Sequence, residues 1–241
     1  NYLAAVVKFA VAIAGFLLIS EVFIDLMISF NKLLWVVIVL SIVVGNLLAI
    51  IQKDAKRVLA YSAIAHTAYF SIGFLEPTLE VFQQAFYAYL IFYTILSLIT
   101  FTIMDVLENN QQEDVGVNLE ELQGLIYRSP FLGTVLILAL LSLAGLPPIF
   151  FALLAKVFVL KALLTAGYIG IACFIVLGTV LGCFYYFKMI ALIVSRTTTE
   201  GETKVLELST TKIMSLFILV GTLFYYTIYP SRIFDYLLRL I

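Results

Sequence analysis

The sequence contains little charge. Only 12% of its 241 residues are Asp, Glu, Lys or Arg, and the net charge is −1. A soluble domain has about twice that charged fraction. The hydrophobic content of 63% and the mean hydropathy of +1.13 therefore indicate a polytopic helical membrane protein. Because the sequence has no basic patch, we expect no nucleic acid as a partner.

Residues that bind metals or cross-link a chain are scarce. His66 is the single histidine, and there are two cysteines. One histidine does not make a ligand cluster, so we expect no metal site. Cys173 and Cys183 lie in one apolar run, about 15 Å apart along a helix, which is too far for a disulfide. The sequence begins at Asn1 without a signal-peptide pattern. We interpret this start as an internal boundary, which a processed chain, a missing disordered leader or one piece of a longer protein would each explain.

Seven apolar runs approach or exceed the roughly 20 residues that a membrane crossing needs. They lie at 2–20, 33–52, 57–75, 82–107, 130–165, 167–195 and 212–229. Backbone polar groups in lipid must be satisfied within each helix. The sequence therefore predicts an all-α, polytopic transmembrane helical bundle of about seven spans. The long polar connection at 108–129 is expected to contain a short surface helix near residues 119–125.

The fifth run, 130–165, is too long for one straight span. As a single helix it would measure roughly 52 Å, against a hydrocarbon thickness of about 30 Å. Gly145, Pro147 and Pro148 interrupt it within LLSLAGLPPIFFALLAK, residues 140–156. Proline removes a backbone donor and frees carbonyl groups, so we predict one discontinuous helix. A broken helix beside a buried charge is typical of an ion pathway.

Three ionisable residues fall inside the spans. They are Lys8, His66 and Lys156. A lysine at the centre of a membrane costs about 3 kcal/mol, which favours a function over snorkelling or helix tilt. For His66, a helix–helix hydrogen bond and a proton relay are equally good interpretations.

No Asp or Glu lies in the middle of a span, so the buried lysines have no evident carboxylate partner in the chain. A chain of Lys8, His66 and Lys156, linked by internal water, is the predicted proton relay. Lys161 and Lys188 lie closer to span ends and can snorkel. The remaining polar aromatic residues are interpreted as packing and interface residues: Tyr185, Tyr186, Tyr225 and Tyr226.

Basic residues are unevenly shared between the two sides of the predicted bundle. The side where the chain begins holds Lys53, Lys56, Arg57, Arg128, Arg196, Lys204 and Lys212, and the other side holds Lys32, Lys161, Arg232 and Arg239. Since loops on the cytoplasmic or matrix side carry the excess of Lys and Arg, we predict that the chain begins on that side.

One segment is specific enough to indicate a family. Residues 52–69, QKDAKRVLAYSAIAHTAY, resemble the K-R-L-L-A-Y-S-S-I-A-H-x-G-Y signature of the antiporter-like subunits of respiratory complex I. Within these, the resemblance is to the family of NADH dehydrogenase subunit 2, called subunit N in bacteria. GNLLAIIQ at 45–52 and LSLAGLPP followed by a lysine also fit, and their order along the chain agrees.

The resemblance implies a single membrane domain over 1–241, similar to helices 8–14 of such a subunit. Lys8, His66 and Lys156 would then form the proton relay, with Gly145, Pro147 and Pro148 at the break of helix 12. No cofactor would bind this chain, because FMN, iron–sulfur clusters and ubiquinone belong to other subunits. The implied partners are a separate N-terminal half of subunit 2, subunits 4 and 4L, and lipids. The implied location is the mitochondrial inner membrane as a multi-pass protein, with the bacterial plasma membrane as the alternative.

The implied function is proton translocation coupled to quinone reduction in other subunits. Two alternatives are a subunit of a multi-subunit cation/proton antiporter and a structural half of the membrane arm that does not pump. The sequence departs from the family at Lys156, which comes nine residues after Pro147 where the family has eight. One extra residue turns a helical side chain by about 100° unless a π-bulge absorbs it.

Overall fold

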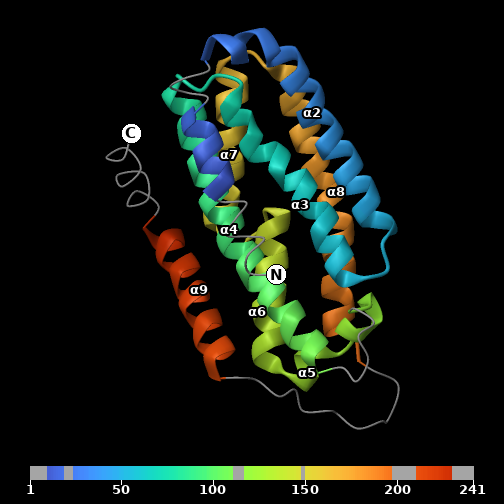
Figure 1. Cartoon of the computed structure of the whole chain (residues 1–241). Coiled ribbons are helices and arrows are strands. Elements are labelled where there is room, and N and C mark those ends of the chain that lie inside the picture. Colours follow the sequence, from blue (N-terminus) through green and yellow to red (C-terminus); the bar gives the residue numbers. More distant parts are fainter. Residues whose placement is uncertain (1–9, 19–23, 111–116, 148–149, 197–209, 230–241) are drawn as a thin grey trace.

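The computed structural model describes residues 10–18, 24–110, 117–147, 150–196 and 210–229, which form a bundle of helices (Figure 1). Two predicted site residues, Lys8 and Pro148, lie outside these ranges. The helices are α2 Ile24–Ile51, α3 Ala55–Ser71, α4 Glu80–Asn109, α6 Pro130–Ala144, α7 Phe150–Thr165, α8 Ile169–Val194 and α9 Thr210–Ile228, with a further helical stretch at 10–18. The predicted all-α fold is confirmed.

The lengths of these helices suit a membrane bundle. Four described helices are long and apolar enough to cross a bilayer: Asn31–Ile51 within α2, α4, α8 and α9. The others are shorter, since α3 has 17 residues, α6 has 15 and α7 has 16. Each of the seven predicted apolar runs overlaps at least one of the described helices.

The predicted break in the fifth run is present. α6 ends at Ala144, and Gly145 follows in the left-handed conformation with φ +85°. An L-residue pays a steric penalty there that glycine avoids. The chain resumes as α7 at Phe150. Two half-length helices therefore replace one long helix, as the sequence predicts.

The helices pack around a central core of aromatic and aliphatic side chains. α2 packs against α3 and α8 on one side of the bundle, and α4 packs against α6 and α7 on the other (Figure 1). α9 lies at the edge beside α4, where Lys212 forms an ion pair with Asp105 at 2.6 Å. The largest fully buried side chains include Tyr89 and Tyr186, both of which reach the centre.

The polar connection after α4 folds back onto the bundle. It contains the 3-10 helix η2 Leu119–Leu122 and the short helix α5 Leu125–Arg128, and all three of their leucines are buried. Backbone hydrogen bonds join its described part to the α2–α3 turn, where Val117 O accepts from Ala55 N at 2.8 Å. Lys56 also forms an ion pair with Glu108 at the end of α4. These contacts close one end of the bundle.

Candidate functional site

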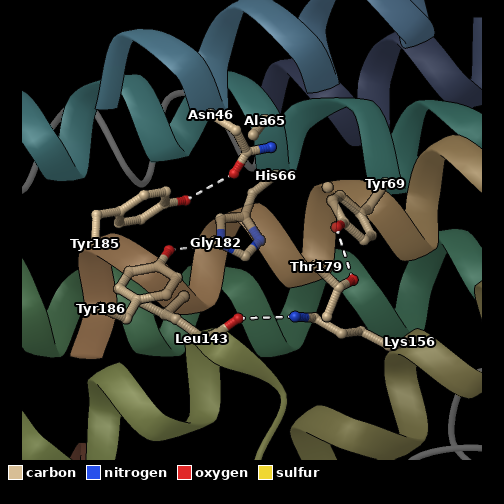
Figure 2. A pocket seen from close by; sticks show the side chains of 11 residues that line it. Asn46, Ala65, His66, Tyr69, Leu143, Lys156, Thr179, Gly182, Tyr185 and Tyr186 are labelled. Carbon is tan, nitrogen blue, oxygen red and sulfur yellow. Dashed lines mark hydrogen bonds between the residues drawn. The ribbon is translucent and has the colours of Figure 1, made fainter. Parts of the chain in front are cut away.

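A small polar cavity lies inside the bundle, between α2, α3, α7 and α8 and beside the end of α6 (Figure 2). The volume that the centre of a water molecule can occupy in this cavity is about 10 Å³, which is roughly enough for one water. The side chains around it that carry polar atoms are Asn46, His66, Tyr69, Lys156, Thr179, Tyr185 and Tyr186. The structure thus brings His66 and Lys156 to one cavity, although they are far apart in the sequence.

Lys156 enters this cavity from the first half of α7. Its side chain is buried, with 9% of the residue exposed. The amine Nζ donates to the carbonyls of Leu143 at 2.8 Å and Ala144 at 3.0 Å. Carbonyls in the last turn of a helix have no partner within that helix. The lysine therefore caps α6 across the break, and the break supplies its acceptors.

The extra residue before Lys156 does not turn the lysine away from the site. The expected 100° rotation, or a compensating π-bulge, assumed a continuous helix between Pro147 and Lys156. α7 is instead an α-helix from Phe150 onward, and Lys156 faces the cavity. Because the described residues 145–147 are not helical, the helical phase of α6 does not fix that of α7.

His66 lies in the second half of α3 and contacts two of the helices packed against it. Its Nδ1 is 2.7 Å from the hydroxyl of Tyr89 on α4, and its Nε2 is 2.9 Å from the hydroxyl of Tyr186 on α8. A neutral imidazole has one donor and one acceptor, so one tyrosine accepts while the other donates. The Tyr93 ring stacks on the imidazole at 5.0 Å between centroids. Both nitrogens are therefore satisfied, and His66 links three helices.

A second set of polar contacts continues from the cavity towards α2 and α8. Tyr185 donates to Asn46 Oδ1 at 3.1 Å, and Asn46 donates to the carbonyl of Ile42 at 2.8 Å (Figure 2). On the other side, the Tyr69 hydroxyl lies 2.9 Å from Thr179 Oγ1. All of these groups lie on apolar spans, where each must find a partner inside the protein.

Sequence reasoning missed the tyrosines of this site. Tyr185 and Tyr186 were interpreted as packing and interface residues, but both are buried with their hydroxyls in the polar network. Tyr69, Tyr89 and Asn46 were not singled out. The available signal was their position, because a tyrosine in the middle of a span needs a hydrogen-bond partner when it is buried. Tyr225, by contrast, is 48% exposed on α9.

The amine of Lys156 has no carboxylate partner in the described part of the chain. The ion pairs found there join Lys56 to Glu108 and Lys212 to Asp105, both among partly exposed side chains. Within the same ranges no three His, Cys, Asp or Glu side chains are grouped to hold a metal ion. The cavity therefore joins an amine, an imidazole, several hydroxyls and space for water, which are groups that can exchange protons.

Comparison with known proteins relates this arrangement to one family. Residues 2–182 match the family described as "NADH:quinone oxidoreductase/Mrp antiporter, TM". The chain is 37% identical over 167 residues to NADH-quinone oxidoreductase subunit N of Methylovorus glucosotrophus, covering 69% of this chain and 34% of the relative. It is 32% identical over 241 residues to subunit N 2 of Hydrogenobaculum sp., covering 99% of this chain and 50% of the relative.

A solved structure agrees with these relatives. A chain of respiratory complex I from Thermus thermophilus with bound aureothin superimposes with a TM-score of 0.66 at 28% identity, covering 83% of this chain and 44% of that chain. The chain thus spans between 34% and 50% of the length of the two curated relatives. The fold and the matched residues relate it to one part of these larger proteins.

Proposed function

Because the chain belongs to the NADH:quinone oxidoreductase/Mrp antiporter transmembrane family, we propose that it translocates protons as a membrane-arm subunit of respiratory complex I. Its relatives are named as subunit N of NADH-quinone oxidoreductase, and a chain of solved complex I superimposes on it. Quinone reduction would occur in other subunits. The observation that carries the proposal is a buried lysine at a helix break that shares one cavity with a buried histidine.

In this proposal each ionisable residue has its own step. Lys8 would receive a proton, His66 would relay it through the hydroxyls of Tyr89 and Tyr186, and Lys156 would pass it on. A water in the cavity would connect the imidazole to the amine. The Gly145 turn supports the role of Lys156, because α6 ends there with the carbonyls that hold the amine. Proton transfer needs donor and acceptor within hydrogen-bond reach or one water away.

The proposed partners are the other membrane-arm subunits, including a separate N-terminal half, subunits 4 and 4L, and lipids. The relatives are bacterial, which favours the bacterial plasma membrane over the mitochondrial inner membrane expected from the sequence. Mass spectrometry of the intact membrane complex tests the assembly. We expect this chain with redox subunits and a complementary half. Co-purification with antiporter subunits and no redox module would instead support a cation/proton antiporter, which the family also includes.

A structural half without pumping is the second candidate. His66 has both nitrogens satisfied and Lys156 caps a helix, so both residues also contribute to stability. Replacing Lys8 and Lys156 together by Met distinguishes the two functions in the assembled complex. Proton translocation predicts fewer protons moved per electron at a normal complex content. An unchanged ratio in a fully assembled complex would favour the structural half.

A further inference from the structure

The amine of Lys156 lies between two backbone carbonyls and an aromatic ring. Nζ donates to Leu143 O and Ala144 O, and it lies 5.6 Å from the centroid of the Tyr69 ring. An ammonium group has three donors and is attracted to the face of an aromatic ring within about 6 Å. We propose that Tyr69 and the last turn of α6 form a binding site for the ammonium form of Lys156. Tyr69 is then a positioning residue of the proton path, a role that rests on the proposed function.

Tyr69 is held firmly in place for this role. Its hydroxyl donates to the carbonyl of Ile175 at 3.1 Å and contacts Thr179 Oγ1, both on α8. Its ring stacks on Tyr89 with centroids 5.1 Å apart and planes inclined by 10°. The residue is 3% exposed. The ring therefore reaches Lys156 from a fixed position between α3, α4 and α8.

Gly145 lies close to the same amine. A Cβ atom at this position would lie 2.9 Å from Lys156 Cδ and 3.0 Å from Nζ. The bare backbone of the break thus allows the amine to approach the carbonyls that end α6. The negative end of a helix dipole lies at its C-terminus and favours a cation there.

This site differs from an ordinary buried ion pair. Partial charges on two carbonyls and a ring surround the amine, and no carboxylate among the described residues pairs with it. The other titratable groups near it are His66 on α3 and Cys183, Tyr185 and Tyr186 on α8. A site of this kind stabilises the ammonium form without fixing the proton through a full opposite charge. The ring thus sets how easily the amine gives up its proton.

Reaction of Lys156 with a membrane-permeant amine reagent tests the proposal in the assembled membrane complex. Only the neutral amine reacts, and the labelled peptide is quantified by mass spectrometry. The rate at pH 7, divided by the plateau rate at high pH, measures the neutral fraction and corrects for access. The variants are Tyr69→Leu, which removes the ring, and Tyr69→Phe, which keeps it. Tyr93→Leu is the matched control, because Tyr93 is a buried ring that stacks on His66.

We expect Tyr69→Leu to raise the ratio roughly three- to tenfold, the range of a partly desolvated cation–π contact. Tyr69→Phe and Tyr93→Leu should stay within about twofold of the unaltered protein. A Tyr69→Leu ratio within twofold, or an equal rise in Tyr69→Phe, would overturn the proposal. The labelling does not depend on pumping. If Lys156→Met left proton translocation unchanged, the proposed function would fail. The ammonium site would still be decided separately, by the labelling ratio of Tyr69→Leu.

Discussion

His66 is held in place by hydrogen-bond partners from two neighbouring helices, so both of its ring nitrogens are occupied. Tyr89 and Tyr186 occupy its two ring nitrogens at 2.7 and 2.9 Å. Buried polar groups of this kind are stabilising only when every member has a partner. The same contacts that stabilise the core therefore also join three helices through one chain of hydrogen bonds.

Removal of one hydroxyl tests this dependence. Tyr89→Phe leaves His66 Nδ1 without its partner in a buried position, and we expect a loss of about 1–3 kcal/mol. The measurement is the temperature at which the solubilised complex loses this subunit. Tyr127→Phe is the control, since Tyr127 is 54% exposed on α5. Equal transition temperatures for the two variants would show that the hydrogen bond contributes nothing to stability.

The site could be predicted in part at this scale. His66 and Lys156 stand out in the sequence because an ionisable residue within an apolar run conflicts with its surroundings. Tyr69, Tyr89 and Tyr186 do not stand out in the same way, because tyrosine is common in membrane helices near the interfaces. Which hydroxyl faces the imidazole depends on how α3, α4 and α8 pack, and this is not encoded in local spacing.

Among the helices, the break between α6 and α7 connects the fold to the site. Gly145 is needed there twice, once for its φ of +85° and once for its closeness to Lys156. Gly167 offers a matched comparison, because it has a φ of +79° but nothing within 4 Å of an added Cβ. The two glycines share the backbone requirement and differ in the lysine contact.

Gly145→Ala and Gly167→Ala therefore separate strain from contact. Each should lose about 1–2 kcal/mol of stability, because an L-residue is disfavoured in the left-handed region. Only Gly145→Ala should also displace the amine and reduce the number of protons moved per electron. Proton uptake and quinone reduction measured in the same vesicles give this ratio. A normal ratio in Gly145→Ala would show that the close approach of the lysine is unimportant.

The break itself was predictable, whereas the direction of Lys156 was not. Gly145 and Pro147 mark a discontinuity by their backbone chemistry alone. Counting residues from Pro147 suggested that the lysine was turned by one position. The count does not settle it because residues 145–147 lie outside both α6 and α7, so the spacing across the break does not fix which face of α7 carries the lysine.

For the whole molecule, the outer faces of α2 and α8 are apolar and exposed. Their exposed side chains include Leu40, Val44, Val180 and Phe184. The length of the apolar runs predicts these spans, since hydropathy reports the membrane environment directly. The sidedness inferred from the basic residues stays a prediction.

A charged side chain placed on this outer surface should reduce membrane insertion most when it lies near the middle of a span. Val180→Arg lies in the middle of α8 with the side chain 52% exposed, and we expect a cost of about 2.5–3.5 kcal/mol for insertion. Phe187→Arg lies beside Lys188, about two turns before the end of α8, where the new side chain can snorkel. The fraction of chain inserted into membranes during cell-free synthesis measures the difference. Equal insertion of both variants would contradict the placement of α8 across the bilayer.

Proton translocation through Lys156 is tested most directly by the number of protons moved per electron in vesicles that contain the assembled complex. Lys156→Met removes the buried amine, and Lys161→Met removes an exposed amine from the same helix, α7. We predict a lower ratio for Lys156→Met and an unchanged ratio for Lys161→Met, with equal amounts of complex. An unchanged ratio in both variants would contradict the account.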